Sequence, residues 1–150
     1  MKKILLLFSL IIFLTGCTFT AKPTITQDEI NLISKRVGES KLIILDIYFS
    51  GCRSCKHIEP IIKKLEEKYA SNKEIIILKY DFSSPTTTAN SLAIAKSIGL
   101  EELYKAQKYS GVVLFISSKT KQTVDELVGE TSEDVYERAI TKNLKRVGNI

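Results

Sequence analysis

The hydrophobic positions of the chain change their spacing several times, and each change marks a predicted element. Residues 42–49 and 74–82 are mostly apolar and rich in β-branched residues, which predicts strands covered on both faces. Residues 112–117 and 124–128 predict two more strands, joined by a short turn and paired antiparallel. Elsewhere apolar residues recur at helical spacing, which predicts helices over residues 26–37, 55–70, 91–98, 100–108 and from 131 or 132 to about 144.

Local signals support several of these boundaries. Thr26 and Glu29 are spaced as a capping box at the start of the first helix. Pro60 lies inside the second helical pattern and predicts a kink, because proline has no N–H and crowds the preceding turn. Residues 81–90 are rich in Ser, Thr and Pro and predict a loop, and Gly99 predicts a break between two helical pieces.

The order of the predicted elements is α-β-α-β-α-β-β-α. Alternation of strands and helices is typical of right-handed crossovers in an α/β fold. The chain therefore predicts a central mixed, mostly parallel sheet of about four to five strands, flanked by helices and closed by an antiparallel hairpin. A length of 150 residues fits one such domain, assigned to residues 26–150.

The N-terminus predicts export. Lys2 and Lys3 precede an apolar stretch at residues 4–14, which is too short to span a bilayer about 30 Å thick. The following Leu-Thr-Gly-Cys sequence ends at Cys17 and resembles the bacterial lipobox, which implies a lipidated Cys17 at the start of the mature protein. An ordinary secretory signal or an uncleaved anchor is the alternative, and either also places the domain outside the cytoplasm.

This division predicts a signal peptide at residues 1–16 and a lipidated cysteine with its tether at residues 17–25. The resulting membrane-anchored lipoprotein would lie on the periplasmic side or at the cell surface. The net charge of +5 does not change this picture, because Lys2 and Lys3 belong to the signal and the other basic residues are mixed with acidic ones. No nucleic-acid partner is predicted.

Lipidation of Cys17 would leave Cys52 and Cys55 as a C-x-x-C pair where a strand passes into a helix. A helix N-terminus favours a thiolate, and outside the cytoplasm such a pair can alternate between dithiol and disulfide. Zinc binding is the usual competitor for this motif. His57 would add a third ligand, which falls short of a closed tetrahedral set, so no metal site is predicted and metal handling stays an alternative.

The sequence from Asp46 to Lys56, DIYFSGCRSCK, resembles the thioredoxin-like fold family. It is similar to membrane-tethered extracytoplasmic members, including the C-terminal domain of thiol:disulfide interchange proteins. Asp46 stands six residues before Cys52, where the family keeps a buried Asp, and Pro60 stands five after Cys55, where it keeps a helix-kinking Pro. The resemblance extends over about residues 26–144.

The resemblance implies a role for each site residue. Cys52 would be the nucleophile, with Arg53 adding positive charge, and Cys55 the resolving thiol. Arg53 and Ser54, between the cysteines, would tune the redox potential. Asp46 would take the Cys55 proton through water, the alternative being a strand-end Asp bonded to a loop; Lys79 could pair with Asp46. No cofactor is implied beyond the redox-active Cys52–Cys55 disulfide.

Two departures from the family pattern concern the substrate side. Gly51 stands where the family has Trp, and Ser110-Gly111 stands where it has a cis-Pro that faces the disulfide. A cis bond without proline costs about 3–4 kcal/mol, so a trans or otherwise altered loop is predicted. Ser110 and Gly111 are thus the candidate substrate loop.

Two functions follow from this pattern. The first is a lipid-anchored thiol–disulfide oxidoreductase that reduces disulfides of exported cysteine-containing proteins, with a membrane thiol protein as a possible electron donor. The second is a non-catalytic binding or chaperone-like lipoprotein whose Cys52–Cys55 disulfide is structural. Asp46 and Pro60 favour the first function, whereas Gly51 and the missing cis-Pro favour the second.

Overall fold

The computed structural model describes residues 21–149, so Cys17 and the predicted signal peptide at residues 1–16 lie outside the described residues. No helix in this part of the chain is long and apolar enough to cross a membrane. The elements follow in the order α1 (Gln27–Glu39), β1 (Leu42–Tyr48), α2 (Arg53–Tyr69), β2 (Ile75–Asp81), α3 (Pro85–Ser97), α4 (Glu101–Ala106), β3 (Val112–Ser117), β4 (Thr123–Val128) and α5 (Glu133–Gly148).

The strands form a four-stranded mixed sheet in the order β2-β1-β3-β4. β1 pairs parallel with β2, whereas the β1–β3 and β3–β4 pairs are antiparallel. The prediction of a mostly parallel sheet is therefore wrong. Two helices, α3 and α4, return the chain to the end of the sheet where β2 finished, so β3 starts beside the end of β1 and runs in the opposite direction.

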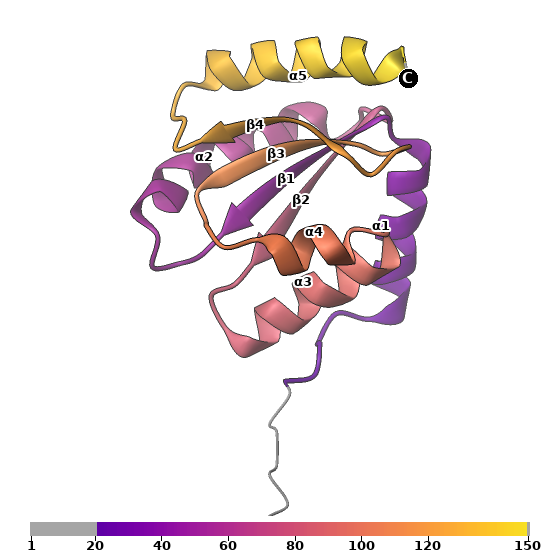
Figure 1. Ribbon diagram of the computed structural model, residues 1–150, viewed down its shortest axis with the longest axis vertical. Helices are drawn as coiled ribbons and strands as arrows, with labels where there is room; N and C mark the ends of the chain where they lie inside the picture. Colours follow the sequence, from indigo (N-terminus) through magenta and orange to yellow (C-terminus); the bar gives the residue numbers. More distant parts are fainter. Residues whose placement is uncertain (1–20, 150) are drawn as a thin grey trace, which may run out of the picture.

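Helices cover both faces of the sheet (Figure 1). Because side chains alternate along a strand, Ile43, Leu45 and Ile47 of β1 pack into the core on the side of α1, α3 and α4. Leu42 and Ile44 pack into the second core, together with side chains of α2 and α5. Asp46 continues the row of Leu42 and Ile44, so a carboxyl group occupies an otherwise apolar face.

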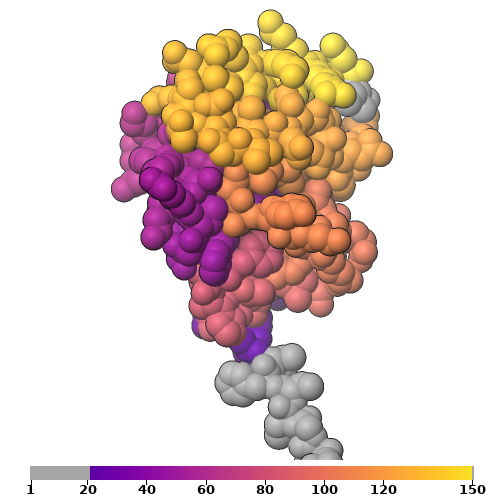
Figure 2. All heavy atoms as spheres, turned by 60° about the vertical axis from the view of Figure 1, so that its left-hand side comes forward, coloured from indigo at the N-terminus to yellow at the C-terminus, as the bar shows by residue number. Residues whose placement is uncertain are grey.

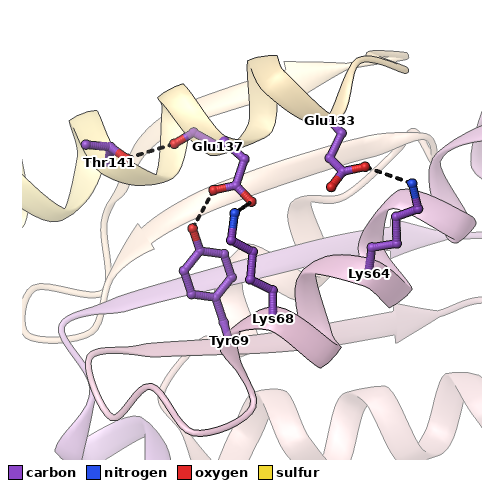
Figure 3. A network of polar contacts seen from close by, with 6 residues as sticks. All are labelled: Lys64, Lys68, Tyr69, Glu133, Glu137 and Thr141. Carbon is purple, nitrogen blue, oxygen red and sulfur yellow. Dashed lines mark hydrogen bonds and ion pairs between the residues drawn. The ribbon is translucent and has the colours of Figure 1, made fainter.

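Ion pairs join α2 to α5 along their exposed edges (Figure 3). Lys64 Nζ lies 2.9 Å from a carboxylate oxygen of Glu133, and Lys68 Nζ lies 2.7 Å from one of Glu137. The Tyr69 hydroxyl donates a hydrogen bond of 2.7 Å to the other Glu137 oxygen. We call these five residues the α2–α5 seam.

The helix boundaries test the local predictions. Thr26 caps α1 and forms the predicted capping box with Glu29, and Gly99, with φ of 74°, separates α3 from α4. The predicted loop at residues 81–90 is wrong, because α3 already begins at Pro85. The Ser84 hydroxyl accepts a hydrogen bond from the Thr87 N–H, and the Ser84 N–H donates to the Thr87 hydroxyl in return, so the Ser/Thr/Pro-rich stretch contains a second capping box.

The last residues of the predicted tether are attached to the domain. The backbone N–H groups of Thr24 and Ile25 donate to the Asn90 side-chain oxygen, at 2.7 and 3.1 Å. The Asn90 amide nitrogen in turn donates to the Thr24 hydroxyl at 3.1 Å. These bonds fix the chain just before α1 to the middle of α3.

Candidate active site

The two cysteines lie where β1 passes into α2. This junction is on the left in Figure 1, the side that Figure 2 brings forward. Cys52 is the N-cap of α2, and its Sγ accepts a hydrogen bond of 3.2 Å from the Cys55 backbone N–H. Cys52 is partly exposed, whereas Cys55, one turn into the helix, is buried. Both are free thiols in the structure. α2 begins two positions earlier than predicted because Cys52 itself caps it.

The two thiols have opposite pKa directions. Burial raises the pKa of Cys52, but hydrogen bonds from the Cys55 thiol, the Ser110 hydroxyl and two backbone N–H groups outweigh it, so this pKa is lowered overall. Burial raises the pKa of Cys55, and its hydrogen bond to Cys52 raises it further. The partly exposed Cys52 thus forms a thiolate at lower pH, whereas the buried Cys55 keeps its proton to higher pH.

The Ser110-Gly111 loop lies directly against the cysteines. Gly111 has φ of 77°, and its N–H donates to the Ile47 carbonyl at 2.9 Å, which ties the loop to the end of β1. A Cβ atom at position 111 would stand 3.0 Å from the Ser54 Cβ and 3.3 Å from the Cys52 Sγ. No peptide bond within residues 21–149 is cis. The altered, trans loop predicted here is present, and it contacts the cysteines through a glycine backbone.

Asp46 lies buried in β1 beside this site. Its side chain is 1% exposed, and neither carboxylate oxygen has a hydrogen-bond partner, so it is not a strand-end Asp bonded to a loop. Burial raises the pKa of Asp46 to about 6, against a smaller lowering by the charge of Lys79. A carboxyl group of this kind can take up and release a proton near neutral pH.

Lys79 does not make the ion pair with Asp46 that the sequence left open. The strand register does place the two residues opposite each other. The Lys79 ammonium instead lies 3.2 Å from a carboxylate oxygen of Glu59 and 4.4 Å from the centre of the Tyr48 ring. The partner of Lys79 is therefore a residue of α2 and not Asp46.

The other predicted site residues lie in α2. Arg53 and Ser54 are exposed in its first turn, and Ser54 also contacts Gly111. Pro60 is exposed within the helix, which continues to Tyr69. His57 is exposed, and within residues 21–149 no three His, Cys, Asp or Glu side chains are grouped to hold a metal ion.

Two residues near the site escaped the sequence reasoning, Glu59 and Phe49. The Phe49 ring covers Gly51 so closely that a Cβ there would lie 2.5 Å from the ring. Phe49 and Tyr109 are 42% and 78% exposed and line one hollow of about 320 Å³ with Phe82, Gln107, Lys108 and Ser110. Gly51 thus makes room for an aromatic surface beside the cysteines. The glycine in the usual Trp position was the sequence signal that could have indicated this place for Phe49.

Comparison with known proteins agrees with this architecture. The Thioredoxin family model matches residues 24–142, and a model of the prokaryotic membrane lipoprotein lipid attachment site matches residues 1–18. Over 98 residues the chain is 31% identical to a protein disulfide-isomerase from Drosophila melanogaster, covering 65% of this chain but only 18% of that protein. Over 117 residues it is 28% identical to a thioredoxin from Coprinus comatus, covering 78% and 92% of the two chains.

Among solved structures, the germline-specific thioredoxin Deadhead from Drosophila melanogaster is 22% identical, with a TM-score of 0.49 over 81% of this chain and 97% of that one. The family assignment rests on the match to residues 24–142, which contain the whole sheet and both cysteines. Thioredoxin-family proteins act through their own cysteine pair and need no cofactor. The chain belongs to the thioredoxin family.

Proposed function

We propose that this protein is a lipid-anchored, extracytoplasmic thiol–disulfide oxidoreductase that reduces disulfides of exported proteins. The observation that carries the proposal is the asymmetry of the two thiols. Cys52 is partly exposed at a helix N-terminus and has a lowered pKa, whereas Cys55 is buried and has a raised pKa. A structural disulfide needs no such difference between its two sulfurs.

The reaction follows from this asymmetry. The Cys52 thiolate attacks one sulfur of a substrate disulfide; a mixed disulfide forms, and the other substrate sulfur leaves as a thiolate that takes a proton from water. Cys55 then gives its proton, through water, to Asp46. The Cys55 thiolate attacks the Cys52 sulfur, and the second substrate sulfur leaves. Two electrons pass to the substrate, and the cysteines end as a disulfide.

The surroundings of the cysteines supply the remaining roles. Ser110 donates to the sulfurs, and the backbone of Gly111 faces the Cys52 Sγ, where a substrate chain would lie. Arg53 and Ser54 are exposed between the cysteines and tune the potential of the pair. Burial leaves Asp46 with a pKa of about 6, which suits a group that receives a proton near neutral pH.

The N-terminal attachment site supports the location. Cys17 would carry the lipid after removal of residues 1–16, residues 17–25 would tether the domain, and residues 26–150 would form it. The partners would be exported cysteine-containing proteins on the outer side of the membrane. A thiol protein of the same membrane would return electrons to the Cys52–Cys55 disulfide.

A non-catalytic binding lipoprotein is the second candidate, favoured by the absence of the family's Trp and cis-Pro. The reduction potential and the exchange rate of the purified domain with a small aromatic disulfide decide between the two. We expect measurable exchange that falls at least ~10³-fold in Cys52→Ser, and a trapped mixed disulfide in Cys55→Ser. A potential below about −300 mV with negligible exchange would indicate a structural disulfide and rule out the enzyme.

A further inference from the structure

The buried carboxyl of Asp46 has a nearby cation, Lys79, whose ammonium is paired with Glu59. The charge of Lys79 lowers the pKa of Asp46. The acidic groups Glu59 and Glu66 of α2 and Asp81 of β2 raise the pKa of Asp46, and the charge of Asp46 in turn raises the pKa of Tyr136 of α5. On the other side β3 places the apolar Val113 opposite Asp46. The state of Asp46 therefore depends on where the Lys79 ammonium points.

Two contacts, with Glu59 and with Tyr48, hold the Lys79 ammonium away from Asp46. Its nitrogen lies 3.2 Å from Glu59 and 4.4 Å from the centre of the Tyr48 ring, and both Lys79 and Glu59 remain partly exposed. The backbone register would allow the opposite choice, because Asp46 and Lys79 face each other across β1 and β2. Glu59 thus competes with Asp46 for the same cation.

The outcome of this competition matters for proton transfer. An ammonium within about 4–6 Å of a carboxylate favours the charged form and lowers its pKa by ~1–3 units. An Asp46 paired with Lys79 would stay ionised and would accept a proton from a thiol less readily. An Asp46 without this partner is the stronger base.

We infer that Glu59 is a positioning residue, which holds Lys79 at the surface and keeps Asp46 free of an ion-pair partner. The inference rests on the proposed role of Asp46 as the proton acceptor for Cys55. Glu59 does not touch the sulfurs, so its effect on the reaction passes through Lys79 and Asp46.

The test is the titration of the Asp46 carboxyl carbon, followed by NMR in the reduced protein without any substrate. In Glu59→Gln, Lys79 is released toward Asp46, and we expect the titration midpoint to fall by about 1 pH unit. Glu66→Gln is the matched control: it removes another acidic charge of α2 that acts on Asp46 but has no bond to Lys79. We expect its shift to be less than half as large.

A double substitution separates the effect of Glu59 through Lys79 from the direct effect of its own charge on Asp46. In a Lys79→Met background, Glu59→Gln should shift the midpoint no more than Glu66→Gln does. Equal shifts for Glu59→Gln and Glu66→Gln, or a full Glu59→Gln shift without Lys79, would overturn the inference. The pH profile of exchange tests the proposed function separately, because Asp46→Asn should remove its step near pH 6 whether or not Glu59 acts as inferred.

Discussion

Two carboxyl groups, Glu137 on α5 and Asp46 in β1, have opposite surroundings. In the α2–α5 seam, burial raises the pKa of Glu137, but the bonds from Lys68 and Tyr69 outweigh it and lower this pKa overall. Within β1, Asp46 has no hydrogen-bond partner, and burial raises its pKa to about 6. One carboxylate is satisfied at the surface, and the other is buried without a partner.

The difference separates what stabilises the fold from what serves the site. Buried polar groups are almost always hydrogen-bonded, so an unpaired carboxyl group in an apolar layer indicates a purpose other than stability. The unpaired group lies in the strand that leads to the cysteines, and the paired group lies on α5, away from them. The three predictions below test whether the two regions differ as much as their contacts indicate.

Asp46→Asn should have the largest effect on stability. Because the pKa of Asp46 is raised from 3.8 to about 6, the unfolded state loses its proton first as the pH increases. The contribution of Asp46 to the free energy of unfolding is fully present below pH 3.8, declines up to about pH 6 and stays low at higher pH. Removing the charge should therefore stabilise the protein by about 3 kcal/mol at pH 8 and by little at pH 4. Urea unfolding at both pH values measures this, and an equal gain at both would contradict it.

Gly111→Ala should have the next largest effect, with Gly99→Ala as its control. Both glycines have a positive φ, but a Cβ at position 99 has nothing within 4 Å, whereas one at 111 presses on Ser54 and Cys52. We expect a loss of about 1 kcal/mol for Gly99→Ala and about 2 kcal/mol for Gly111→Ala. Only the second should also change the alkylation rate of Cys52, and a similar change in Gly99→Ala would show that the loop acts indirectly.

Glu137→Gln should have the smallest effect. The substitution keeps an acceptor for the Tyr69 hydroxyl but removes the ion pair with Lys68, so we expect a loss of about 0.5–1 kcal/mol that shrinks at high salt. Because the pKa of Glu137 is lowered, its stabilisation is present above the unfolded pKa and disappears as the pH falls through the folded one. Glu133→Gln, at a more exposed pair, is the control and should cost less than Glu137→Gln.

The parts of the structure that the sequence predicted depend on local signals. The position of the C-x-x-C pair at a strand–helix junction, the capping box of Thr26 and the extent of β3 each follow from a few neighbouring residues. The thioredoxin-like fold class is confirmed as well. It could be predicted because the order of the elements and the spacing of Asp46 and Pro60 from the cysteines can be read from the sequence.

The parts that the sequence did not predict depend on competition between groups or on long-range contact. The register places Lys79 opposite Asp46, but only the structure shows that Glu59 binds the ammonium instead. The close approach of Gly111 to Cys52 joins residues far apart in the chain. The predicted direction of β3 was wrong: both helices before it were predicted, but the end of the sheet to which they return the chain is a long-range property that local patterns do not show.

The bonds between Asn90 and the chain before α1 set how far the cysteines can travel. If Cys17 carries the lipid, the chain from Cys17 to the first of these bonds, at Thr24, can span at most about 25 Å. The cysteine pair would then stay within a thin layer above the membrane and would not reach the rest of the compartment. Under the proposed function, substrates confined to the same layer would meet it at a high effective concentration, so the anchor would select among equally reducible disulfides by their height above the bilayer.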